Sequence, residues 1–341
     1  MKLKLDALDM LGSIHLLSEQ CADAWQAMKA VSLPASYKKI NKIVLFGMGG
    51  SALGIDALRN LYSSQIKLPL LIVNDYNIPA WVDNNTLAIL SSYSGQTEET
   101  KAAALKILHL TKKVFVITTG GFLASFAKTH RLPVYLLKPR YNPCNQPRIA
   151  VGYSIVSQIS LLNKLGLLSI KQPEINELIH FLGKQKNKLA ATAYRQAKKI
   201  KNKIPLFLAS EFLLGNAHIL ANQINENGKN MAAYFALPEA NHHLLEGLIL
   251  PKNNSQNLFF VLINSRYYHP RNQKRYTITK KVISRSKVGF LEFRPTAKNK
   301  FLQFFEVLSW GSYLSFYLAQ LNHKDPSPIP WVDYFKHELQ K

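Results

Sequence analysis

The chain has 341 residues, 47% of them hydrophobic, so it is long enough for two domains and can bury a large core. It carries 43 Lys and Arg against 20 Asp and Glu, a formal net charge of +23 at pH 7. Such a surplus favours anionic partners and resists self-association. No nucleic-acid recognition motif accompanies the basic runs, so we interpret them as a solvated Lys-rich surface and predict no nucleic-acid partner.

The two cysteines, Cys21 and Cys144, lie far apart in the sequence and match no metal-binding or redox spacing. None of the ten histidines has a His or Cys partner at ligand spacing, so we predict no metal and no cofactor. The chain has no run of about 18 uninterrupted apolar residues, and its start lacks the apolar run of a signal peptide. We therefore expect a cytoplasmic chain with free thiols and no membrane partner.

After a helical prelude over residues 1–38, the first half alternates short apolar runs with helix-length segments. Parallel strands that are buried on both faces appear as continuous apolar runs, and each needs a crossover to the next strand. This rhythm predicts a parallel sheet with helices on both faces. The expected strands are 42–46, 68–73, 86–90, 114–118 and 133–137.

The second half repeats this rhythm after a long apolar helix expected over 152–168 and a candidate linker over 169–177. Further helices are expected at 212–224, 274–283, 301–321 and 331–339, and strands at 205–208, 232–235, 258–263 and 288–293. We therefore predict an α/β fold with two similar domains, 1–168 and 169–341.

A glycine turn follows the first expected strand, in the sequence Gly47-Met-Gly49-Gly50-Ser51, and a helix follows the turn. Glycines let the backbone turn tightly, and a helix N-terminus favours anions, so the turn predicts an anion site. A loose dinucleotide fingerprint, with Asp75 as the ribose acceptor, is an alternative. It is weaker, because its third glycine is Ala and Asp75 lies further on than the usual ~20 residues.

A second loop, 92–97, follows the third expected strand and offers the hydroxyls of Ser92, Ser94 and Thr97. Hydroxyls and backbone N–H groups at a helix N-terminus can hold a phosphate. The alternative is a simple helix cap by Thr97, with the two following glutamates serving the helix dipole. Because the glycine turn, itself a predicted anion site, precedes this loop in the chain, we favour a phosphate site.

Seven motifs in this order resemble those of the bifunctional phosphoglucose/phosphomannose isomerases, which are built from two sugar-isomerase (SIS) domains. The resemblance covers nearly the whole chain. The motifs are GMGGSALG (47–54), SYSGQTEET (92–100), QPRIAVGYS (146–154), NENGK (225–229), PEANHH (238–243), HPR (269–271) and SFYLA (315–319) with later DP and FK pairs.

The resemblance implies an aldose–ketose isomerase acting on phosphorylated hexoses as a homodimer. It assigns the phosphate site to two loops, with backbone room from glycines: Gly49, Gly50, Ser51, Ser92, Ser94 and Thr97. It places Arg148 beside C1 and C2 of the sugar and makes Glu226 the catalytic base. It makes His242 the ring-opening histidine, contributed across the dimer interface, and Lys336 the lysine near the ring oxygen.

Taken alone, the four catalytic candidates are weaker signals, and Lys336 carries none. Glu226 could cap a turn, Arg148 could form an interdomain salt bridge, and His243 beside His242 makes the choice of histidine open. A regulatory sugar-phosphate-binding protein of the SIS type is the alternative function. It would keep the hydroxyl loop but would not need Glu226, His242 and Lys336 together.

The reaction itself demands the same residue types. Ring opening needs an acid/base, and a carboxylate must move a proton between C2 and C1 through a cis-enediol. A cation near the enediolate stabilises its charge. Three positions depart from the family pattern, namely Gln96, Gly228 and the pair His243-Leu244, and we expect them to affect efficiency and sugar preference.

Overall fold

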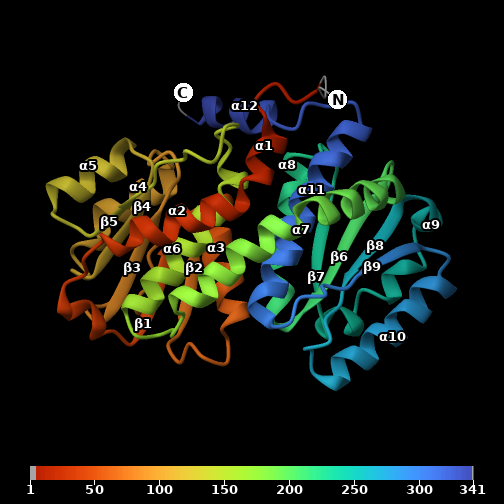
Figure 1. Cartoon of the computed structure of the whole chain (residues 1–341), viewed down its shortest axis with the longest axis horizontal. Helices are drawn as coiled ribbons and strands as arrows, with labels where there is room; N and C mark the ends of the chain where they lie inside the picture. The colour runs from red at the N-terminus through yellow and green to blue at the C-terminus, as the bar shows by residue number, and fades with distance from the viewer. Residues whose placement is uncertain (1–4, 340) are drawn as a thin grey trace.

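The computed structural model describes residues 5–339 and residue 341, and it contains two parallel β-sheets flanked by helices (Figure 1). The first sheet has the strand order β2-β1-β3-β4-β5 and the second has the order β7-β6-β8-β9. All neighbouring strands are parallel. The strands are β1 Lys42–Phe46, β2 Leu70–Val73, β3 Thr86–Ser91, β4 Val114–Thr118, β5 Val134–Leu136, β6 Ile204–Ser210, β7 Ala233–Leu237, β8 Leu258–Ile263 and β9 Gly289–Phe293.

The α-helices connect these strands and lie on both faces of the first sheet (Figure 1). They are α1 Met10–His15, α2 Leu17–Lys29, α3 Gly50–Leu61, α4 Glu98–Ile107, α5 Gly121–Thr129, α6 Val151–Lys164, α7 Gln172–Ile200, α8 Leu214–Glu226, α9 Asn254–Asn257, α10 Pro270–Arg285, α11 Lys300–Leu321 and α12 Pro330–Glu338. The predicted α/β class with two parallel sheets is confirmed.

Alternate residues of β1 pack on opposite faces of the first sheet, as strand geometry requires. Ile43 and Leu45 join a cluster with buried residues of α2, α3 and α6, whereas Val44 and Phe46 join residues of α4 and α5. The first cluster continues into the second sheet through α7, α8 and α11. The two halves therefore share one continuous apolar core.

The expected linker over 169–177 is wrong from residue 172 onward, because α7 begins there. Pro173 lies in the first turn of α7, where its missing N–H costs no hydrogen bond. The Glu174 carboxylate accepts from the Lys171 backbone N–H at 2.8 Å, which is the contact that the third helical residue makes in a capping box. The proline is thus part of a helix start, and α7 runs on for 29 residues.

The two halves meet closely where α3 packs on α8. Gly215 of α8 has no Cβ, and an ideal Cβ there would lie 2.3 Å from Ala57 Cα. The Asp56 carboxylate of α3 also pairs with His218 Nδ1 of α8 at 2.8 Å. This packing fixes α8 against the first half of the chain.

Gly215→Ala is expected to destabilise the protein by about 1–3 kcal/mol, because the methyl group meets backbone that cannot move aside. Gly183→Ala is the matched control, since nothing lies within 4 Å of an ideal Cβ on this α7 residue. The control should gain about 0.5–1 kcal/mol from helix propensity. Urea unfolding measures both, and equal stability of the two variants would contradict the close approach.

Candidate active site

Three loops gather at the carboxyl edge of the first sheet, where β1, β3 and β4 end. Ligands of open parallel sheets bind at this edge. The glycine turn after β1 leads into α3, with Gly49 as its N-cap at φ +47°. Gly50 lies against the backbone of Pro147 and Arg148. An ideal Cβ built on Gly50 would lie 3.3 Å from Arg148 Cα. The turn therefore adjoins the segment that holds Arg148.

The loop after β3 brings its hydroxyls together. Ser92 Oγ and Thr97 Oγ1 lie 2.8 Å apart, and the Gln96 N–H donates to Ser94 Oγ at 3.2 Å. Thr97 is the N-cap of α4 but makes no side-chain cap bond. Its hydroxyl therefore belongs to the loop and does not act as the helix cap that the alternative interpretation required.

Ser51 joins the two loops. Its Oγ accepts from the Tyr93 N–H at 3.0 Å, and its carbonyl oxygen accepts from Ser91 Oγ at 2.9 Å. Ser92 is buried, Ser51 and Thr97 are partly buried, and Ser94 is exposed. The four predicted hydroxyls thus line one edge of the sheet, beside the N-termini of two helices that favour anions.

Arg148 is buried in the short 3₁₀ helix Pro147–Ile149, with 3% of its side chain exposed. Its guanidinium donates to four acceptors. Nε donates to Asn227 Oδ1 at 2.5 Å, and Nη1 to Gln146 Oε1 at 2.7 Å. Nη2 donates to the carbonyl oxygens of Pro326 at 2.9 Å and Ser327 at 2.7 Å. These contacts fix a cation between segments from both halves.

Glu226 is the last residue of α8 and lies beside this cation. Its Oε2 is 3.7 Å from Arg148 Nη1, and its side chain is 30% exposed. Burial raises the pKa of the Glu226 carboxyl, while the positive charges of Arg148, Lys229 and Lys336 oppose this shift. A carboxylate with a raised pKa beside a fixed cation is suited to accept and return a proton.

Polar residues that the sequence analysis left unassigned hold this pair in place. Asn227 Nδ2 donates to Ser315 Oγ at 3.0 Å, and Gln223 Nε2 donates to the Arg148 carbonyl oxygen at 3.0 Å. Ser312 Oγ in turn donates to Gln223 Oε1 at 3.2 Å. Asn227 lies in the NENGK motif, so this motif could have indicated a role for it.

Lys336 lies on α12, a helix with no buried residue. Its charge lowers the pKa of Glu226, so the two side chains lie in the same region. Figure 1 shows α12 at the same end of the molecule as α1 and the N-terminal segment. Gln320 Nε2, near the carboxyl end of α11, donates to the Leu5 carbonyl oxygen at 2.9 Å.

His242 lies apart from Glu226. It is exposed in the 3₁₀ helix Glu239–His242, which follows the carboxyl end of β7. Glu226 is the last residue of α8, which starts near the carboxyl end of β6 and returns to the amino end of the sheet. With 13 residues, α8 is about 20 Å long. Within the described residues, no hydrogen bond or ion pair joins the two. The neighbouring His243 lies 3.9 Å from a Glu239 oxygen.

The structure shows what surrounds two of the three positions that depart from the family pattern, Gln96 and Gly228. The Gln96 side chain lies against Gly121, and its Cγ would lie 3.2 Å from an ideal Cβ built on Gly121. An alanine in place of Gly228 would place its Cβ 2.7 Å from the Ile224 carbonyl oxygen. The turn after Glu226 therefore packs more closely on α8 than an alanine allows without a local shift.

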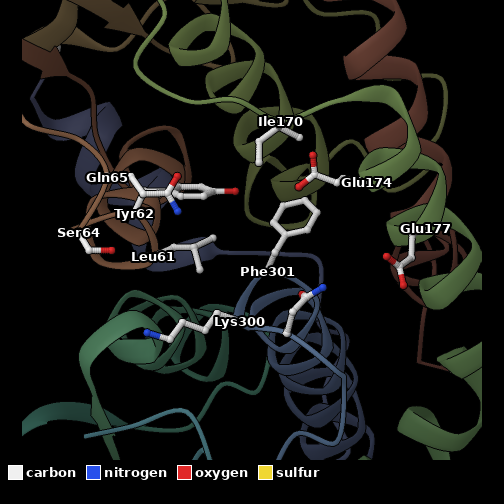
Figure 2. A pocket seen from close by; sticks show the side chains of 10 residues that line it. Leu61, Tyr62, Ser64, Gln65, Ile170, Glu174, Glu177, Lys300 and Phe301 are labelled. Carbon is white, nitrogen blue, oxygen red and sulfur yellow. The ribbon is translucent and has the colours of Figure 1, made fainter.

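A separate cavity of about 280 Å³ lies at the far end of α3, away from these loops (Figure 2). In Figure 2, Tyr62 and Gln65 follow α3, while Glu174 and Phe301 face them from the starts of α7 and α11. None of the predicted site residues lines it. In the described part of the chain, no cluster of three or more His, Cys, Asp or Glu residues is arranged to hold a metal, and no helix is long and apolar enough to cross a membrane.

Comparison with known proteins identifies the family of the chain. Residues 190–339 match the family described as bacterial phospho-glucose isomerase C-terminal SIS domain. A bifunctional phosphoglucose/phosphomannose isomerase of Caldicellulosiruptor bescii is 32% identical, covering 97% of this chain and 98% of the relative. A second one, from Aquifex aeolicus, is 27% identical and covers 88% of this chain and 90% of the relative.

A solved structure of a hypothetical protein from Thermus thermophilus superposes with a TM-score of 0.73 at 15% identity. The match covers 97% of this chain and 89% of that one. At this identity the superposition establishes the fold alone. The family follows from the full-length sequence relatives: the chain belongs to the bifunctional phosphoglucose/phosphomannose isomerases.

Proposed function

We propose that this chain is an aldose–ketose isomerase that interconverts glucose 6-phosphate, and also mannose 6-phosphate, with fructose 6-phosphate. One observation carries the proposal: the Glu226 carboxylate lies 3.7 Å from the buried Arg148 guanidinium. The Arg148 backbone adjoins Gly50, in the turn that Ser51 joins to a loop whose hydroxyls can bind a phosphate. The family's full-length relatives are named for the same two activities.

The substrate phosphate is bound by Ser51 and by the 92–97 loop, through Ser92, Ser94 and Thr97. Gly49 and Gly50 leave room for it at the N-terminus of α3. The sugar then extends from this loop toward Arg148, whose backbone adjoins Gly50. Binding through the phosphate thereby places C1 and C2 beside the carboxylate–guanidinium pair.

Proton transfer follows ring opening. Glu226, as the carboxylate, removes the proton from C2 of the open aldose, and the C1 carbonyl becomes an enediolate oxygen. Arg148 stabilises this negative charge. The hydroxyl proton on O2 moves to O1, and Glu226 returns its proton to C1, which gives the ketose with its carbonyl at C2. Formation of mannose 6-phosphate from the ketose requires rotation about the C2–C3 bond before the proton returns to C2. Lys336 contacts the region of the ring oxygen.

The ring-opening histidine comes from a second copy of the chain in this proposal. Within one chain, His242 and Glu226 lie at opposite edges of the second sheet, which supports a site shared between two chains. The apolar side chains of α12 lie open to solvent, with Trp331 82%, Tyr334 60% and Phe335 61% exposed. A homodimer would cover such a surface.

A mixing experiment tests this shared site. His242→Ala and Glu226→Gln should each inactivate the protein alone, and mixing the two after unfolding and refolding together should recover activity. Recovery is expected because mixed dimers hold one site with both residues intact. A mixture as inactive as its components, with dimers confirmed by light scattering, would place His242 outside the partner's site.

Thr97→Val is expected to raise KM for fructose 6-phosphate about tenfold, with kcat nearly unchanged. It removes one hydroxyl from the phosphate loop but keeps the side-chain shape, and a hydrogen bond to a charged group contributes about 1.5 kcal/mol. Uniform binding of this kind affects KM alone. Steady-state kinetics with Thr129→Val, in the last residue of α5, as the control measures the effect.

Product analysis tests the proposed function. The purified protein is incubated with fructose 6-phosphate, and the aldose phosphates are separated by chromatography. We expect both glucose 6-phosphate and mannose 6-phosphate. Tight binding of the sugar phosphate without either product would favour the regulatory protein instead.

We also place the enzyme in the cytoplasm, because both cysteines are free and buried.

A further inference from the structure

Lys229 lies in the turn after α8, three residues beyond Glu226, and its ammonium contacts two separate segments. Lys229 Nζ donates to the Glu226 carbonyl oxygen at 2.5 Å and to the Pro326 carbonyl oxygen at 3.2 Å. It also donates to the Pro328 carbonyl oxygen. One cation thus binds the carboxyl end of α8, where helix carbonyls lack partners, and the segment 326–328.

Arg148 contacts the same segment. Its Nη2 donates to the carbonyl oxygens of Pro326 and Ser327, so the Pro326 oxygen is shared by both cations. The segment leads directly into α12, which begins at Pro330 and carries Lys336. The position of α12 relative to Glu226 therefore depends on carbonyl oxygens that Arg148 and Lys229 bind together.

The backbone of Lys229 is unusual. Its φ is +51°, in the left-handed region where a side chain costs conformational free energy and glycine does not. Glycine is the usual residue in such a turn after a helix. The three carbonyl contacts of the Lys229 side chain offset this cost.

We infer that Lys229 is a positioning residue of this isomerase, which holds Glu226 and α12 in place for proton transfer; the inference rests on the proposed function. Its ammonium acts through the carbonyl oxygens of Glu226, Pro326 and Pro328 and does not touch the sugar. Loss of these contacts leaves the phosphate loop intact but lets α12 and the end of α8 move apart. Small displacements of a catalytic carboxylate are costly, because proton transfer requires close alignment.

The charge on Lys229 gives this role a pH dependence. Burial and the nearby Arg148 guanidinium lower its pKa to about 8, against the attraction of the Glu226 and Asp325 carboxylates. Lys336 faces Glu226, and Asp333 faces Arg148, from α12. Above pH 8 the amine is neutral and binds the carbonyls more weakly, so kcat should fall there.

Three variants of the full chain test the role: Lys229→Met, Lys229→Gly and Lys229→Arg. The first two should lower kcat roughly 10- to 100-fold with KM for fructose 6-phosphate nearly unchanged. Lys229→Gly removes the same contacts but relieves the backbone strain that Lys229→Met keeps. Lys229→Arg should recover most of kcat and move the basic limb of the kcat profile upward, because a guanidinium keeps its proton.

Lys287→Gly is the matched control. Lys287 has φ +58°, follows α10 and is exposed, so the substitution relieves the same strain far from the site. Its kcat should match the wild type. Hydrogen exchange of residues 330–338 should become faster in Lys229→Met and Lys229→Gly only.

Wild-type kcat and unchanged exchange over 330–338 in Lys229→Met and Lys229→Gly would overturn the inference. A basic limb that stays in place in an active Lys229→Arg variant would do the same. A wild-type protein without isomerase activity would refute the proposed function instead. Hydrogen exchange would then still decide whether Lys229 holds α12.

Discussion

Glu226→Gln is expected to lower kcat by about 10²- to 10⁴-fold, the usual contribution of a positioned acid/base group. Glutamine keeps the size of the side chain but cannot accept a proton. The loss should therefore appear in kcat, while the Ser/Thr loop still binds the substrate phosphate and KM changes little. Steady-state kinetics in both directions measures the effect.

The control for this variant is Glu177→Gln on α7. Glu177 is a partly exposed glutamate whose Oε1 pairs with Lys298 Nζ at 2.6 Å, beside the cavity at the far end of α3 from the phosphate loop. An exposed pair contributes about 0–1 kcal/mol, so this variant should keep wild-type kinetics. If Glu226→Gln also kept wild-type kcat, the catalytic base would be another residue.

The raised pKa of Glu226 also sets the sign of its pH effects. Its carboxyl must be ionised to act as a base, so kcat should fall as the pH drops through the raised value. In the folded protein this group binds a proton more readily than in the unfolded chain. Its ionisation above the ordinary pKa therefore opposes folding, and Glu226→Gln removes this cost.

Arg148→Lys is expected to lower kcat by about 10²- to 10³-fold, the usual cost of losing a donor that stabilises an oxyanion. Lysine keeps the positive charge, but a single ammonium cannot reach all four acceptors that the guanidinium binds. The cation would shift away from the position of the enediolate oxygen. Burst and steady-state kinetics would locate the loss in the chemical step.

Arg148→Met should in addition reduce the free energy of unfolding by about 3 kcal/mol, because a buried charge partner and its acceptors lose their contacts. Arg59→Lys is the control. The Arg59 side chain is half-exposed on α3, and its Nη2 pairs with Asp56 Oδ1 at 2.7 Å. It should change neither activity nor stability by more than a small amount. Full activity of Arg148→Lys would mean that another cation stabilises the intermediate.

The strand pattern was predictable because buried parallel strands leave continuous apolar runs. β1, β4 and β8 begin and end where the sequence indicates. The start of α7 was not predictable in the same way, since Pro173 is a helix breaker in most positions and only its place in the first turn makes it acceptable. The capping contact of Glu174 decides the matter, and such contacts are hard to infer from composition.

The site was predictable in its residue types but not in its arrangement. The Ser/Thr loop is continuous in the sequence, so its hydroxyls could be grouped from the pattern alone. The acceptors around Arg148 come from residues 146, 227, 326 and 327, which only the fold brings together. Lys229 ends the NENGK motif, but its role depends on two segments almost a hundred residues apart, which the motif does not show.

The most direct test of the proposed chemistry is deuterium incorporation. Fructose 6-phosphate is converted in deuterated water, and the label at C2 of both aldose phosphates is followed by nuclear magnetic resonance. Transfer through a cis-enediol with Glu226 as the base predicts deuterium at C2 of glucose 6-phosphate and mannose 6-phosphate, and no exchange with Glu226→Gln. Aldose products without deuterium, or undiminished exchange in the variant, would contradict it.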